Sequence, residues 1–343
     1  MTKRLLRMPL DGPLLFDLIS HGRLGSAGRL SLPQIEQIRR TVRRVPEVMV
    51  KVTGGGRSVR AVAAHLAYIG HEGEVELDTD RSEHIPEDGQ KEFLGTWHLE
   101  LSAGQYRPKG AAQSVATRIK LVHNIVLGMP SPTPPEKVLA AAKAFAREKF
   151  GSQHRYAMAL HTHQQHPHVH LVVKAEREDG HGRLHIDKAM LREWRQDFAR
   201  MMREQGIAAN ATSRFARGQT KRATKDAFYR TRQRGESYVL RENLDGIVRE
   251  LKQTKTISDP ARAQLLETRK AIIAGWNAIA AKLEAQGEIS LSGDVRYFAK
   301  HLPPVLTDRE RLATQFIRFV QAKQSARTPR DDRVRDPTLE RTR

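Results

Sequence analysis

The chain has 343 residues, and its 59 lysines and arginines outnumber its 39 aspartates and glutamates, which gives a formal net charge of +20 at pH 7. This length can bury the core of one large domain or two ordinary ones, so a bare linker or peptide is excluded. The charge predicts a polyanionic partner, because clustered cations gain affinity by displacing counterions from a phosphate backbone. The absence of cysteine excludes disulfides, thiolate metal sites and cysteine nucleophiles.

The N-terminal region carries no apolar segment that would anchor the chain. No apolar run approaches the ~20 residues that span a bilayer, and the basic start MTKRLLRMPLDG has no long apolar segment behind it. We therefore expect a cytoplasmic protein without membrane insertion. Residues 1–30, with their glycine, serine and basic side chains, are expected to form a flexible basic segment.

Between residues 31 and 211 the hydrophobic pattern changes repeatedly from helical to strand periodicity. In its first half it predicts a helix at Pro33–Val45, a strand at 48–53, a helix at 59–69 capped by Ser58, and a hairpin-like stretch GEVELDTD. In its second half it predicts a strand at 120–128, a helix from Glu136 to Phe150, strands at 155–163 and 168–175, and a helix at 187–205 ended by Gly206. Since short loops join antiparallel neighbours, we expect an α+β domain with a mainly antiparallel sheet and flanking helices.

The composition changes after this domain. Residues 212–236 are expected to form a basic linker or helix, because the stretch 214–234 holds eight lysines and arginines against one acid, Asp226. Helical periodicity at 237–326 predicts an all-helical C-terminal domain with an interruption near Ser290–Gly293. The Arg-rich tail, 327–343, is too polar to fold alone and is expected to be disordered.

The strongest chemical signal is the sequence HTHQQHPHVH at His161–His170. If the four-residue loop 164–167 sets the register, His163 lies opposite His168 and His161 lies opposite His170, so that all four imidazoles share one face. Cross-strand partners have Cβ atoms ~5 Å apart, close enough for their imidazoles to bind one ion. Apolar residues flank the motif on both sides, which favours a metal site over an adventitious histidine tract.

The hairpin and its neighbouring motifs resemble those of the relaxase, or mobilisation nuclease, family of conjugative plasmids and integrative elements (MOBP-type, HUH endonuclease superfamily). The resemblance covers about 51–210 and rests first on His168-Val169-His170 with His161 upstream. A glycine run, Gly54–Gly56, also precedes a helix that carries a tyrosine, Tyr68. The segments NIVLGMP, FAREKFG and LREWRQDFARMMREQGI follow in the same order.

The resemblance implies a DNA relaxase with an HUH core. Tyr68 would attack a phosphodiester at an origin of transfer and leave a 5′-phosphotyrosyl DNA and a free 3′-hydroxyl. His161, His168 and His170 would hold a divalent metal ion, with Mg²⁺ or Mn²⁺ expected and other transition metals as alternatives. Independently of the family, Val62, Leu66 and Ile69 form the core-facing stripe of helix 59–69, so Tyr68 lies on a neighbouring face. Without the resemblance, a surface-covering aromatic is the simpler interpretation of that residue.

His163 departs from the family pattern, because relatives commonly carry an acid at this position. We count it with Tyr68 as a catalytic candidate that acts as a fourth metal ligand, as a base for Tyr68, or as a silent replacement. His166 is assigned to the turn. The candidate DNA contacts are basic residues near the motifs, namely Arg57, Arg60, Lys174, Arg214, Arg217, Lys221 and Arg222, although any one of them can equally belong to a solvated charged face.

Two tryptophans, Trp97 and Trp194, are candidates for stacking on unpaired bases, with a core role favoured for Trp194. The implied partners are single-stranded or supercoiled origin-of-transfer DNA, a relaxosome accessory protein and a type IV coupling protein. The competing hypotheses are a rolling-circle replication initiator or HUH transposase, a non-catalytic metal-stabilised DNA-binding protein, and a metal-dependent hydrolytic nuclease. Tyr68 precedes the histidines, and this order favours a relaxase over the initiators and transposases.

Overall fold

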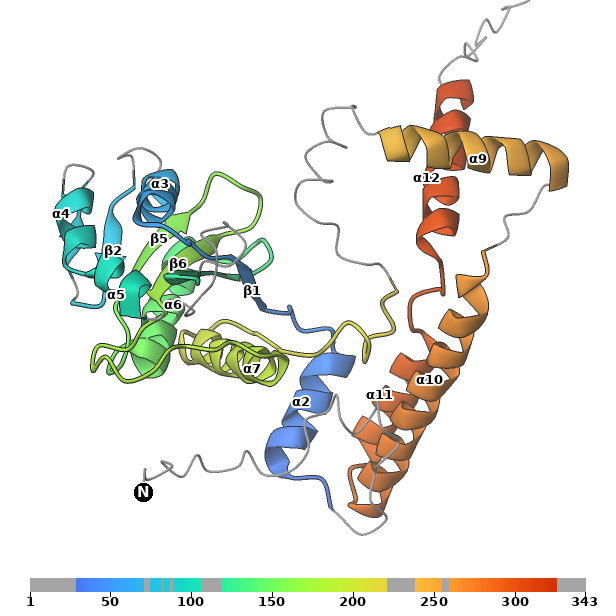
Figure 1. Cartoon of the computed structure of the whole chain (residues 1–343). Helices are drawn as coiled ribbons and strands as arrows, with labels where there is room; N and C mark the ends of the chain where they lie inside the picture. Colours follow the sequence, from blue (N-terminus) through green and yellow to red (C-terminus); the bar gives the residue numbers. More distant parts are fainter. Residues whose placement is uncertain are drawn as a thin grey trace, which may run out of the picture. The chain divides into compact units, whose positions relative to one another are not determined.

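The computed structural model describes residues 29–70, 75–81, 83–86, 89–105, 119–220, 238–254 and 259–325 (Figure 1). The chain divides into two compact units, one formed by Ser31–Thr212 and the other by Met1–Leu30 together with Ser213–Arg343. Among the helices in these described ranges, none is long and apolar enough to cross a membrane.

The Ser31–Thr212 unit contains a six-stranded sheet in which each strand pairs antiparallel with its neighbours, in the order β1-β4-β6-β5-β2-β3. Its strands are β1 (Met49–Gly54), β2 (Leu77–Thr79), β3 (His84–Ile85), β4 (Val122–Gly128), β5 (Tyr156–His161) and β6 (His168–Lys174). Its helices are α2 (Leu32–Val42), α3 (Val59–Ile69), α4 (Gln90–Gly95), α5 (Leu99–Gln105), α6 (Pro135–Phe150) and α7 (Lys188–Glu204). The predicted α+β fold with a mainly antiparallel sheet is confirmed.

Two short helices, α4 and α5, were absent from the sequence prediction. They have six and seven residues, too few turns for a 3.6-residue hydrophobic period to stand out. The helix that follows β1, α3, has the bounds that the sequence predicts, Val59–Ile69. It starts directly after the N-cap residue Ser58, whose side chain accepts a hydrogen bond from Ala61 N at 3.2 Å.

The alternation of side chains along the central strands gives the sheet two covered faces. One face carries Met158, Leu171 and Val173 and packs against α6 and α7. The opposite face carries Ala157 and Val172, together with other strand residues, and packs against α3 and α4. Residues of even number on β6 therefore lie on the same side of the sheet as α3.

The two tryptophans of this unit both belong to its core. Trp194 lies on α7, is 2% exposed, and packs edge to face on Phe145 at 5.9 Å between ring centroids, which confirms the favoured core role. Trp97 is fully buried and packs on Phe93 at 5.5 Å. The idea that Trp97 stacks on DNA bases is therefore wrong, because its ring faces are taken by protein neighbours.

The connection from β1 to α3 depends on glycine. A Cβ atom on Gly55 would overlap the Val122 carbonyl oxygen, and one on Gly56 would overlap the Val62 side chain. The backbone can approach β4 at Gly55, and the first turn of α3 at Gly56, only because these residues lack a side chain. This close approach fixes where α3 begins and so where Tyr68 lies.

A buried ion pair joins the residue that follows β2 to the residue that precedes β5. Arg155 is 4% exposed, and its Nε donates to Asp80 Oδ2 at 2.7 Å. We expect Asp80→Ala to lower the free energy of unfolding by about 3–5 kcal/mol, because it leaves the guanidinium buried without a counter-charge. Chemical denaturation of the full chain measures this, with Arg155→Ala and the double variant completing a cycle. Purely additive effects of the two substitutions would contradict the pairing.

The helical unit holds α9 (Tyr238–Thr254), α10 (Ala261–Ala285), α11 (Ile289–Lys300) and α12 (Asp308–Ser325), which confirms a helical C-terminal region. The predicted interruption exists but is displaced by a few residues, since Ser290–Gly293 lie inside α11. The break is centred on Gly287, whose φ of +86° favours glycine and follows the end of α10 at Ala285. Within this unit, Trp276 Nε1 donates to the Ala216 carbonyl at 2.7 Å.

Candidate metal and nucleophile site

The histidine hairpin forms, but its register differs from the prediction. His161 pairs with His168, and Ala159 pairs with His170. β5 ends at His161, so His163 lies in a six-residue turn, 162–167, rather than in the strand. Pro167 lacks the N–H that a further ladder bond would need. Because the shift is by two residues, the strand histidines stay on the face that the alternation predicted.

Three histidines from β5 and β6 come together on the α3 side of the sheet. His161, His168 and His170 each offer one ring nitrogen, and these three atoms all lie within 4.8 Å of one another. The ring centroids are 5.4 Å apart for His161 and His168, 4.4 Å for His161 and His170, and 5.1 Å for His168 and His170. Three convergent imidazoles with no protein thiolate or carboxylate among them suit a divalent metal ion.

Backbone carbonyls orient two of these rings. His168 Nδ1 donates to the His166 carbonyl at 2.9 Å, which leaves Nε2 as a lone-pair donor. His161 Nε2 donates to the Ile69 carbonyl at 2.7 Å, which leaves Nδ1. Metal-ligating histidines characteristically use the second ring nitrogen in this way. The residues present therefore fit a metal ion, and the bond to Ile69 also ties the triad to the end of α3.

Two imidazoles of the triad, those of His168 and His170, are held neutral by a lowered pKa. Burial, followed by the neighbouring imidazoles of His161 and His168, lowers the pKa of His170 to about 3. Burial also lowers the pKa of His168. Neutral imidazole is the form that binds a metal ion, so protons do not compete for His170 near neutral pH.

Tyr68 stands beside this triad. Its side chain is 55% exposed on α3, whereas Leu66 and Ile69 are buried, as the helical pattern predicts. The Tyr68 ring lies edge-on to the His170 ring with centroids 6.4 Å apart. The structure thus places an exposed phenol and a three-histidine cluster on one face of the sheet.

His65 completes the cluster, and the sequence analysis gave it no role. Its ring is stacked with Tyr68 at 6.0 Å and lies 6.4 Å from the His170 ring. Its Nε2 is buried and makes no hydrogen bond within the described residues, and burial lowers its pKa. The spacing of three residues between His65 and Tyr68 on a helix was the available signal.

The remaining hairpin histidines lie in the turn. His163 is exposed, with its ring centroid 5.1 Å from that of His161 and 6.4 Å from that of His168. His166 Nδ1 accepts a hydrogen bond from Ser131 N at 3.0 Å. His163 therefore lies at the edge of the triad, and His166 fastens the turn to the segment before α6.

The candidate DNA contacts separate by position. Arg57 and Arg60 are exposed around the start of α3. The prediction that Lys174 contacts DNA is wrong. Lys174 is 7% exposed and lies at the end of β6 that is remote from His168. Its Nζ lies 3.8 Å from Glu176 Oε2 and 3.6 Å from Glu178 Oε1. A buried, paired ammonium does not serve as a phosphate contact.

Four further candidates follow the Ser31–Thr212 unit. Arg214 is exposed and Arg217 is half-buried, and both belong to the second unit. Lys221 and Arg222 lie outside the described residues.

We expect the metal-free protein to lose stability on mild acidification. Burial lowers the pKa of His123 to about 4 and that of His170 to about 3, below the value near 6.5 of an unfolded histidine. Between the lowered pKa of the folded chain and the pKa near 6.5 of the unfolded chain, the unfolded chain binds more protons than the folded chain. The free energy of unfolding therefore falls as the pH drops through this range. Each group contributes up to about 1.4 kcal/mol per pH unit in that window.

Denaturation at pH 6.8 and pH 5.2 with a chelator present measures this slope above the range where carboxylates titrate. The His123→Asn variant should show a shallower slope than the unsubstituted protein. Equal stability at both pH values in the unsubstituted chain would contradict the lowered pKa values of these histidines.

Comparison with known proteins agrees with the geometry. Residues 100–207 match the family model for the relaxases described as MobA/VirD2-like, nuclease domain. This range contains the three-histidine cluster, and α3 with Tyr68 lies before it. Within this range, the chain is similar to the nuclease domain of relaxases, or mobilisation nucleases.

Similar curated proteins carry the name T-DNA border endonuclease VirD2. The protein from Agrobacterium fabrum (strain C58 / ATCC 33970) is 27% identical over 211 residues, which cover 57% of this chain and 46% of the relative. The one from Rhizobium radiobacter is 28% identical over 204 residues, which cover 55% and 47%. The matches thus span about half the length of these relatives.

A solved structure titled "Molecular Basis of Vancomycin Resistance Transfer in Staphylococcus aureus" aligns with 49% of this chain and 99% of its own. The identity is 13% and the TM-score is 0.31.

Proposed function

We propose that this chain is a DNA relaxase that nicks one strand at an origin of transfer by tyrosine transesterification. The observation that carries the proposal is the exposed phenol of Tyr68, 6.4 Å between ring centroids from His170 of a three-histidine cluster. The match of residues 100–207 to the nuclease-domain model supports a nuclease, and the name of the VirD2 relatives supports action on DNA. In this proposal residues 31–211 form the catalytic domain, followed by a basic linker (212–236), a helical domain (237–326) and a tail (327–343).

The proposed reaction exchanges one phosphodiester for another. The oxygen of Tyr68 attacks the scissile phosphorus, a P–O bond to Tyr68 forms, and the P–O3′ bond breaks. The phenolic proton passes to a base, and the departing 3′-oxygen takes up a proton to become a 3′-hydroxyl. Because the bond energy is kept in the phosphotyrosyl linkage, attack by a 3′-hydroxyl reverses the reaction and rejoins a strand.

The histidines have distinct tasks in this proposal. His161, His168 and His170 hold a divalent ion, Mg²⁺ or Mn²⁺, which when bound neutralises charge on the phosphate oxygens. The carbonyls of Ile69 and His166 fix two of the rings in a ligating tautomer. We propose His163 as a further catalytic residue at the edge of the triad, acting as a fourth ligand or as a base.

Sequence-independent contacts to phosphates would position the strand. We propose Arg57 and Arg60 for this task within the catalytic domain, together with Arg214, Arg217, Lys221 and Arg222 after it. A relaxosome accessory protein and a type IV coupling protein are the proposed protein partners.

Product-end analysis tests the reaction class. Full-length protein is incubated with Mn²⁺ and single-stranded oligonucleotides that tile candidate transfer-origin DNA. A relaxase releases a fragment whose 3′-hydroxyl a polymerase extends, and its other fragment migrates with the protein. Free 5′-phosphate ends would identify a hydrolytic nuclease, and binding without cleavage of the cognate origin would favour the non-catalytic alternative.

A further inference from the structure

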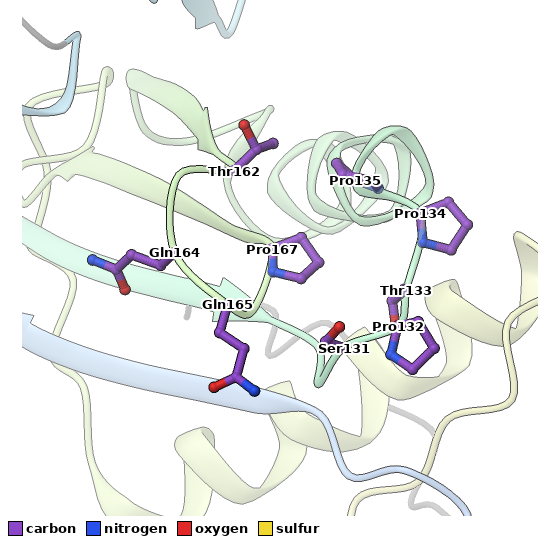
Figure 2. Close-up of a pocket in the computed structure, with 9 residues that line it drawn as sticks. All are labelled: Ser131, Pro132, Thr133, Pro134, Pro135, Thr162, Gln164, Gln165 and Pro167. Atoms are coloured by element: carbon purple, nitrogen blue, oxygen red, sulfur yellow. The ribbon is translucent and has the colours of Figure 1, made fainter.

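A pocket lies next to the histidine triad and has no part in the reaction described above. Figure 2 shows its two walls, the hairpin turn and the segment that leads into α6. Its volume is about 480 Å³, within the range of small-molecule sites. The lining residues are Ser131, Pro132, Thr133, Pro134, Pro135, Thr162, Gln164, Gln165 and Pro167.

The pocket is joined directly to the metal ligands. Thr162 follows His161 and Pro167 precedes His168, so the turn that forms one wall begins and ends at two triad residues. Continued strand alternation puts Thr162 and Pro167 on the α6 side of the sheet, so a strand bound at the triad would pass around the end of the hairpin to bring a base to this pocket.

Hydrogen bonds hold the two walls together. Ser131 N donates to His166 Nδ1 at 3.0 Å, and Met129 N donates to the Pro167 carbonyl at 3.2 Å. Within the second wall, Thr133 Oγ1 donates to the Pro130 carbonyl at 2.7 Å. The pocket is thus a preformed feature, and a ligand would find its shape already in place.

The lining chemistry selects the kind of group that fits. None of the lining residues is ionisable, so the pocket offers no charge to a phosphate. Proline rings give apolar surfaces of the kind that proteins place against base planes. The amides of Gln164 and Gln165 each present a donor and an acceptor, the pairing that reads an adenine edge. A flat, uncharged heterocycle with hydrogen-bonding edges matches this combination.

We propose that this pocket binds one unpaired nucleobase of the substrate strand close to the scissile phosphate, and that it contributes to sequence preference. The proposal rests on the proposed function, since it takes the DNA strand as given. It assigns base recognition to the turn between the metal ligands and leaves phosphate binding to the arginines. Selectivity and chemistry are thereby linked through a single hairpin.

Binding measurements test the pocket without requiring cleavage. The full chain carrying Tyr68→Phe selects ligands from a randomised single-stranded DNA library, and the best ligand is then scanned with one abasic site at a time. We expect one position, or two adjacent ones, where loss of the base weakens binding on the order of ten-fold. In the Gln164→Ala/Gln165→Ala variant, the intact ligand should bind about ten-fold more weakly, and the abasic penalty at that position should disappear.

The matched control is Gln153→Ala, because Gln153 precedes β5 at the end of the strand opposite His161. This control should keep both the affinity and the abasic penalty. An unchanged penalty in the double variant, or an equal loss at every position, would overturn the pocket proposal. Absence of any DNA binding by the Tyr68→Phe chain would contradict the proposed function itself, and the pocket proposal would fall with it.

Discussion

Tyr68→Phe is expected to abolish the covalent protein–DNA adduct and to leave the affinity for single-stranded DNA nearly unchanged. The substitution removes one oxygen from a side chain that is 55% exposed, so the fold loses little. The reaction loses its nucleophile, which we expect to lower the rate of adduct formation at least about 10³-fold. Denaturing gels measure the adduct, and fluorescence anisotropy with a labelled oligonucleotide measures binding.

Tyr297 supplies a matched control for this experiment. It is also exposed on a helix, and its ring stacks on His301 at 3.9 Å between centroids, but it belongs to the helical unit. Tyr297→Phe should therefore form the adduct at the rate of the unsubstituted protein. An adduct that survives Tyr68→Phe would move the nucleophile to another residue.

His170→Ala is expected to weaken Mn²⁺ binding on the order of 10²-fold or more. It leaves two of the three convergent imidazoles, and loss of even an outer partner of a metal ligand costs 10- to 100-fold in affinity. Isothermal titration measures the affinity directly. The rise in melting temperature on adding Mn²⁺ reports the same linkage, because an ion that binds only the folded state stabilises it.

His185→Ala is the control for metal binding, since His185 is an exposed histidine of the same unit outside the three-histidine cluster. It should bind Mn²⁺ like the unsubstituted protein. If His170→Ala also does so, the triad is not the metal site. A histidine substitution that merely disturbs the fold would show itself by a lower melting temperature with chelator present.

The elements around the site could be predicted because local signals define them. Ser58 and the stripe of Val62, Leu66 and Ile69 determine both the start of α3 and the face it buries. Two-residue alternation placed His168 and His170 on one face of β6. The register itself was wrong by two residues, since alternation fixes the face of a strand but leaves the length of its turn open.

Features that depend on tertiary contacts could not be predicted from the sequence. From its charge alone, Lys174 was predicted to contact DNA, but its position in the strand buries it beside Glu176 and Glu178. Trp97 lies in a segment with too few turns to show a helical period, so its burial was not apparent. The pocket also depends on tertiary structure, because its walls meet only when the turn after β5 packs on the segment before α6.

Peptide mapping of the covalent adduct tests the central claim most directly. Full-length protein is incubated with Mn²⁺ and the oligonucleotide that it cleaves, denatured, digested with nuclease and protease, and analysed by mass spectrometry. We expect a nucleotide 5′-phosphate attached to Tyr68 in the peptide from α3. Attachment to another residue, or cleavage that leaves every peptide unmodified, would contradict it.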